Sequence, residues 1–66
     1  MKPVISVFET ELENKESLRS QLQNLGKQIS SRGVIEYLPK QKKATEVIRI
    51  LRENGIGYQI RFVTSA

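Results

Sequence analysis

Apolar and polar positions recur along this chain with two different periods, and each period predicts one kind of element. Between residues 39 and 55 the apolar side chains recur at helical spacing and share one face of a helix. That face comprises Ala44, Val47, Ile48 and Leu51. Asn54-Gly55 ends the helix, because glycine adopts a left-handed backbone at a helix C-terminus without a steric clash.

A second helical pattern spans residues 15–31. Leu18, Leu22, Leu25 and Ile29 recur at spacings of four, three and four, and they form a narrow apolar stripe. Such a stripe suits packing against a small sheet, and pairing with a helix of a second copy or a partner is the alternative. We favour Asn14 as the N-cap, and a capping box of Thr10 with Glu13 is the alternative. Gly26 lies inside the predicted helix, at a cost of about 1 kcal/mol relative to alanine.

Three stretches have the pattern of strands. Residues 3–8 and 34–38 are short runs rich in β-branched side chains, and residues 58–64 alternate apolar with polar positions. The order β-α-β-α-β predicts one α/β domain over residues 1–66, with a three-stranded sheet and two helices packed on one face. Parallel pairing is favoured by the intervening helices, and an α+β arrangement with an antiparallel first strand is the alternative.

The alternation also predicts which side chains share each face of the sheet. The face beneath the helices is expected to carry Ile5, Val7, Ile35, Tyr37, Ile60 and Phe62. The other face mixes polar and apolar side chains, and Glu36 and Arg61 are placed to pair on it. A domain of 66 residues has a small core, and this one has no cysteine for a disulfide. We therefore expect a homodimer through the mixed face or by edge pairing of strands, with these candidate interface residues: Val4, Phe8, Val34, Leu38, Arg61 and Val63.

The formal net charge is +4, and a basic balance favours polyanionic partners: nucleic acid first, acidic protein surfaces second. Lysines cluster where the 39–55 helix begins, although cations there oppose the helix dipole. A bound anion would explain that placement, because the first-turn N–H groups point to the same side. Basic residues on a solvated helix face are the plainer interpretation. The candidate phosphate-binding residues are Lys40, Lys42, Lys43, Thr45, Arg49 and Arg52.

The residue types available argue against an enzyme. The chain has no histidine and no cysteine, and no serine lies in a GxSxG turn. Gly55-Ile56-Gly57 lacks the third glycine of a dinucleotide-binding loop. The four glutamates between residues 9 and 16 fit the start of a helix better than a cation site. We therefore predict neither a cofactor nor a metal.

Within residues 33–64 the segments GVIEYLP and GIGYQIRFV flank a predicted helix. In outline this arrangement resembles the strand–helix–strand unit of glutaredoxin-like domains. Where such a domain has its paired cysteines, this chain has the segment 40–43, KQKK. A thiol redox role is excluded because there is no thiolate.

No apolar run reaches the length of a membrane span or a signal peptide, so no membrane partner is expected and the cytoplasm is the default location. Two hypotheses of function remain. One is a small nucleic-acid-binding or regulatory protein that contacts phosphates through the Lys/Arg strip of the 39–55 helix. The other is a protein-interaction module, such as a small inhibitor, an adaptor or a subunit of an assembly, without nucleic-acid binding.

Overall fold

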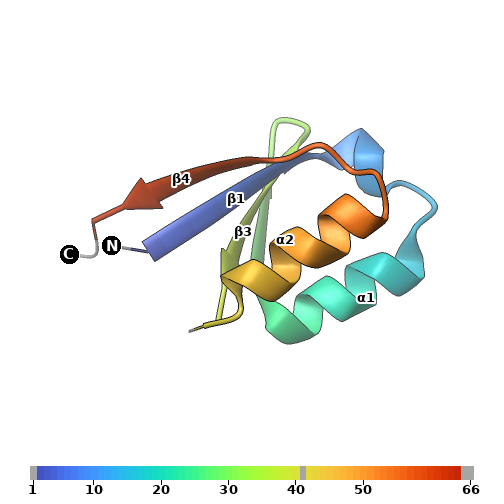
Figure 1. The fold of residues 1–66 in the computed structure, drawn as a ribbon. Coiled ribbons are helices and arrows are strands. Elements are labelled where there is room, and N and C mark those ends of the chain that lie inside the picture. Colours follow the sequence, from blue (N-terminus) through green and yellow to red (C-terminus); the bar gives the residue numbers. More distant parts are fainter. Residues whose placement is uncertain (1, 41, 65–66) are drawn as a thin grey trace.

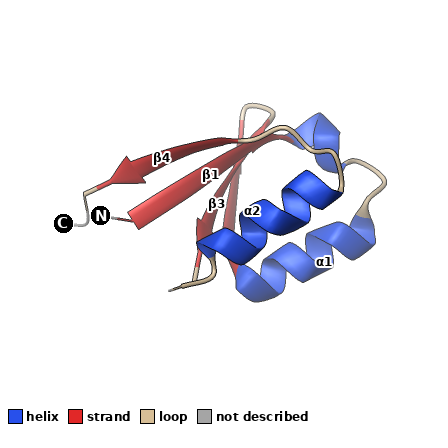
Figure 2. Ribbon diagram, in the orientation of Figure 1, coloured by secondary structure: helices blue, strands red, loops and turns tan. Residues whose placement is uncertain are grey.

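Four strands, two α-helices and one short 3-10 helix follow one another in the computed structural model, which describes residues 2–40 and 42–64 (Figure 1 and Figure 2). In chain order they are β1 (Lys2–Phe8), η1 (Glu9–Leu12), α1 (Glu16–Leu25), β2 (Gly26–Ser31), β3 (Val34–Pro39), α2 (Ala44–Glu53) and β4 (Gln59–Val63). Gln41, which falls in the predicted 39–55 helix, lies outside the described residues.

The strands form one sheet in the order β2-β3-β1-β4, and each neighbouring pair is antiparallel. The predictions of three strands and of parallel pairing are therefore wrong, and the chain is α+β. This strand order with β-α-β-β-α-β connectivity is the split β-α-β, or ferredoxin-like, arrangement. It hosts many unrelated functions, so it assigns none to this chain. The strands of the unit that resembles glutaredoxin-like domains, β3 and β4, are not neighbours, because β1 lies between them.

The additional strand, β2, comes from the second half of the predicted 15–31 helix. α1 ends at Leu25, and residues 26–31 pair with β3 from Gly26↔Pro39 to Ser31↔Val34. The connecting residues Arg32 and Gly33 both have positive φ, 53° and 79°, as a two-residue type I′ hairpin turn requires. Ile29, expected on the buried stripe, is instead 51% exposed on β2.

Both helices begin later than predicted. α1 has Lys15 at its N-cap, without a side-chain cap bond, because η1 occupies residues 9–12 and Asn14 adopts a left-handed φ of 62°. The predicted caps at Asn14 and at Thr10 with Glu13 are therefore wrong. α2 begins at Ala44, since Lys42 has a φ of 64° and breaks any earlier helical turn.

The predicted stop at Asn54-Gly55 is confirmed. Gly55 has a φ of 68° and donates its N–H to the carbonyl oxygen of Arg52 at 3.1 Å. The N–H of Ile56 donates to the carbonyl oxygen of Leu51 at 2.9 Å. These two bonds make a Schellman motif, and the side chain of Ile56 is buried as that motif favours.

One face of the sheet contributes to the core, and we call it the inner face. The buried cluster joins Ile5, Val7, Ile35 and Tyr37 to apolar side chains of both helices: Leu18, Leu22, Val47, Ile50 and Leu51. These four strand residues were predicted for this face. The expectation that Ile60 and Phe62 are also buried is wrong: their register with Ile5 and Pro3 places them on the inner face, but they are 41% and 58% exposed. In Figure 1 the start of β1 and the end of β4 extend past both helices, which leaves this part of the inner face uncovered.

The opposite side of the sheet, which we call the outer face, carries the residues predicted for it. From β1, β3 and β4 these are Val4, Ser6, Phe8, Val34, Glu36, Leu38, Gln59, Arg61 and Val63, and β2 adds Lys27, Ile29 and Ser31. Within the described residues, no helix has both the length and the apolar character needed to cross a membrane.

Candidate nucleic-acid interface

Three segments of the chain meet at one end of the sheet, and four exposed lysines lie on them. Lys27 lies at the start of β2, opposite Leu38 of β3. Lys40 follows β3, and its N–H donates to the carbonyl oxygen of Leu25 at 2.7 Å, beside the start of β2. Lys43 donates its N–H to the carbonyl oxygen of Lys40 at 2.9 Å and so joins the start of α2 to the same place. We call these residues the lysine corner: Lys27, Lys40, Lys42 and Lys43.

The first turn of α2 adds hydrogen-bond donors to this corner. Lys43, at its N-cap, makes no side-chain cap bond. The N–H groups of the first helical turn have no partner within their own helix, and the dipole gives this end a partial positive charge. The positive charges of nearby lysines are unfavourable beside this partial positive charge. A bound anion would interact favourably both with the lysines and with the N–H groups.

The lysines at this corner have few acidic neighbours. The side chain of Lys43 lies 3.5 Å from a carboxylate oxygen of Glu46. Among residues 2–40 and 42–64, no acidic side chain lies within 4.0 Å of the amines of Lys27, Lys40 or Lys42. All four lysines are exposed. Their charge is therefore available to a ligand in solution.

The rest of the predicted basic strip is different in character. Arg49 lies 3.1 Å from Glu53 and 4.0 Å from Glu46, so its charge is matched within α2. Thr45 and Arg52 are exposed on the same helix. The structure thus places Lys40, Lys42 and Lys43 at the same end of the sheet as Lys27, which lies on the outer face, and leaves Arg49 engaged with two glutamates. Lys27 was missed because its segment was assigned to a helix.

Acidic residues gather at the other end of the central strands. Glu9 and Glu11 lie in η1, Glu13 follows it and Glu16 begins α1. The N–H of Glu9 donates to the carbonyl oxygen of Gly33 at 2.8 Å, which places this group where β3 starts, whereas Lys40 lies where β3 ends. The chain has 11 basic and 7 acidic residues, so the seven basic residues outside the lysine corner balance the acids formally. Three of the four lysines at the corner, Lys27, Lys40 and Lys42, thus add to the excess of basic residues without an acidic partner among the described residues.

The predicted pairing of Glu36 with Arg61 on the outer face is confirmed. These residues lie on β3 and β4, with β1 between them, so the ion pair passes over β1. Val4, on the outer face of β1, is 4% exposed although it is not part of the core cluster. Of the candidate interface residues, Val4 therefore has almost no solvent-accessible surface for a partner to contact, whereas Phe8 is 67% exposed. Val34, Leu38 and Val63 are partly exposed, and Arg61 holds Glu36.

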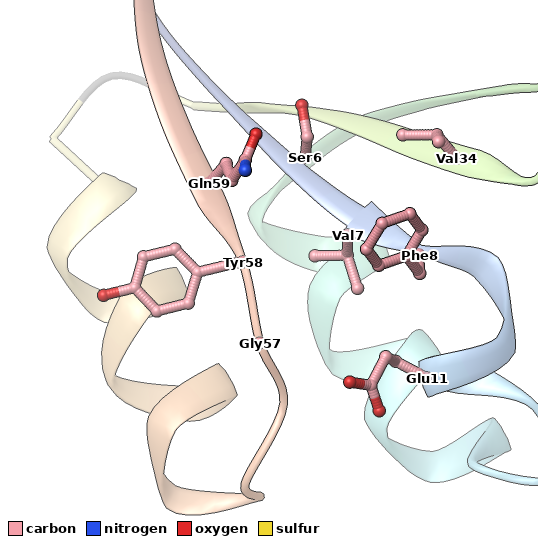
Figure 3. Close-up of a pocket in the computed structure, with 8 residues that line it drawn as sticks. All are labelled: Ser6, Val7, Phe8, Glu11, Val34, Gly57, Tyr58 and Gln59. Atoms are coloured by element: carbon pink, nitrogen blue, oxygen red, sulfur yellow. The ribbon is translucent and has the colours of Figure 1, made fainter.

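A shallow pocket of about 400 Å³ opens at the acidic end, where β1 and β4 separate. Ser6↔Gln59 is the last register pair between these strands, and Gly57 and Tyr58 leave the sheet beyond it. Figure 3 shows the Glu11 side chain on the Gly57 side of the pocket and the Tyr58 ring turned away toward α2. The lining is otherwise mainly apolar, with Val7, Phe8 and Val34. One carboxylate is too few for a metal site, and its charge disfavours an anion here.

No family model matches this chain, and neither a curated protein nor a solved structure gives a significant match to it. The function is therefore argued from the residues and their arrangement.

Proposed function

We propose that this chain is a small, non-catalytic nucleic-acid-binding protein that holds phosphates at the lysine corner. The observation that carries the proposal is the exposure of Lys27, Lys40 and Lys42 at one end of the sheet, without acidic neighbours among the described residues. Lys40 and Lys42 directly precede the uncapped start of α2, and Lys27 lies on the outer face of the same end. Phosphate oxygens are the anions that clustered amines and helix N-termini bind in nucleic acids. Exposed Thr45 adds a hydroxyl donor on the same helix.

This arrangement favours contacts to the backbone over contacts to bases. The exposed aromatic side chain of the outer face, Phe8, lies at the acidic end of the sheet, away from the lysines. Phe62, 58% exposed, lies at the lysine end of the sheet but on β4, with β1 between it and β3, so base stacking is not expected to be the main contact. Binding through about three or four phosphates predicts an affinity that falls steeply with salt, with a log–log slope of roughly −3 for duplex DNA.

Fluorescence anisotropy of labelled DNA and RNA duplexes across a salt series tests the proposal. We expect binding at low salt, and at least a tenfold loss of affinity with a slope shallower by about two for Lys40→Glu/Lys42→Glu. Lys15→Glu/Arg32→Asp is the matched control: it changes the net charge equally but lies at the acidic end, and aspartate tolerates the left-handed φ at position 32. Absence of binding at low salt, or equal losses in the two variants, would contradict the proposal.

The second candidate, a protein-interaction module, is favoured by a different observation. Within the part of the chain that the structure describes, four large apolar side chains are well exposed: Phe8, Ile29, Ile60 and Phe62. Ile60 and Phe62 adjoin each other on the inner side of β4, and adjoining exposed apolar side chains favour a protein contact, as in an inhibitor, an adaptor or an assembly subunit. Capture of partners from the native host with and without nuclease separates the two candidates. Partners that resist nuclease support the module, and partners lost with nuclease support nucleic-acid binding.

A further inference from the structure

The two edges of the sheet, β2 and β4, are protected to different degrees. An edge strand leaves a row of backbone N–H and C=O groups free to pair with another strand, and lysine or proline on the strand discourages that pairing. β2 carries Lys27. β4 has the sequence QIRFV, with neither lysine nor proline, and its one charge, Arg61, is held by Glu36 over its own sheet. β4 is therefore the less protected edge.

The inner side of β4 is also uncovered. Ile60 and Phe62 point to the inner face but lie beyond the reach of the helices and are largely exposed. In Figure 1 this part of β4 extends with the start of β1 as a two-stranded ribbon. β4 therefore has a free backbone edge that no other strand pairs with. It also has two large apolar side chains that no helix covers.

We propose that β4 pairs antiparallel with β4 of a second copy, which makes a homodimer with one continuous sheet. A two-fold axis at Ile60 places Gln59 opposite Arg61 of the second copy and Phe62 opposite Tyr58, so that no like charges face each other. An axis at Arg61 would oppose two guanidinium groups, which cross-strand pairing disfavours. The charges on the strand thus exclude the register at Arg61 and are compatible with the register at Ile60. The proposal does not depend on phosphate binding at the lysine corner, which lies on other segments.

The size of the contact sets the concentration at which it forms. One strand of five residues from each copy contributes less than the roughly 800 Å² per partner of a standard interface. The dimer is therefore expected to dissociate in the micromolar range, and its test must reach several hundred micromolar.

Sedimentation equilibrium of the whole chain from about 5 to 500 μM tests this proposal. We expect the unmodified protein to be a dimer at the upper end. Phe62→Lys and Ile60→Lys should each weaken association at least tenfold, because each places a charge in the apolar row beside the edge. Ile29→Lys is the matched control, since it removes a similarly exposed apolar side chain from the other edge strand. Circular dichroism melts establish that each variant is folded.

Each outcome bears on the proposal. Loss of association in the two β4 variants, with association retained in Ile29→Lys, supports it. A monomeric unmodified protein at 500 μM overturns it, as does retained association in a folded β4 variant. Loss of association in Ile29→Lys points to the outer face or β2 and also overturns it.

Discussion

Two buried polar side chains on the inner face lack well-formed hydrogen bonds. The hydroxyl of Tyr37 and the amide nitrogen of Gln28 are buried, and neither makes a hydrogen bond of good geometry among the described residues, although the backbone of Leu25 interacts with the Tyr37 hydroxyl. They lie opposite each other on β3 and β2. An unpaired buried polar group costs about 1–3 kcal/mol, so this pair is a weak point of the core.

The first prediction concerns the dependence of stability on pH. Burial raises the pKa of Tyr37 from its ordinary value of 10.0 to about 12, and the nearby backbone of Leu25 opposes this shift. Between these values the unfolded chain has lost the phenolic proton and the folded protein retains it. The stability that this group contributes is therefore present below pH 10 and is lost as the pH rises toward 12. The loss amounts to roughly 2–3 kcal/mol at most.

Denaturant unfolding between pH 9 and 12 measures this effect when Tyr37→Phe is compared with the unmodified protein. The variant should lose less stability over this range, because phenylalanine does not ionise. At neutral pH it should be at least as stable as the unmodified protein, since it removes a hydroxyl without a well-formed hydrogen bond. Parallel stability curves across the alkaline range would show that Tyr37 does not titrate as expected.

At the scale of the elements, the boundary between α1 and β2 depends on a close approach of two backbones. A Cβ added at Gly26 would lie 2.3 Å from the carbonyl oxygen of Leu38. Gly26→Ala should therefore push β2 away from β3 and lower the free energy of unfolding by about 2 kcal/mol or more. Gly57→Ala is the control, because its Cβ would lie 3.8 Å from its nearest neighbour, a carboxylate oxygen of Glu11. Equal stabilities of the two variants in urea unfolding would refute this account of Gly26.

This boundary also shows where the sequence pattern fails. Leu18, Leu22 and Leu25 do lie on one side of a helix, and Ile29 continues their spacing although it belongs to a strand. The approach that requires glycine at position 26 comes from the segment 38–39, which is distant in sequence. By contrast β1, β3, β4 and the Gly55 stop depend on neighbouring residues, and they were predicted to within one or two residues.

At the scale of the whole molecule, the faces of the strands were predicted better than their order. The period of two assigns each strand residue to a face whatever its neighbours are, so the Glu36–Arg61 pair was found despite the wrong topology. Tertiary packing determines which part of a face the helices cover. The alternation of apolar and polar positions therefore did not predict that Phe62 is exposed. The same distinction holds at the candidate site. Lys40 and Lys42 are close in sequence and could be identified, whereas Lys27 is added by the β2–β3 hairpin.

The most direct test of phosphate binding at the lysine corner is an NMR titration of the isotopically labelled chain with a short DNA duplex at low salt. We predict that the largest amide shift changes fall at Lys27 and at residues 40–46, and that added salt reverses them. Changes centred on Phe8, Val34 and Ile29, or no changes at all, would contradict the assignment of the lysine corner as the nucleic-acid interface.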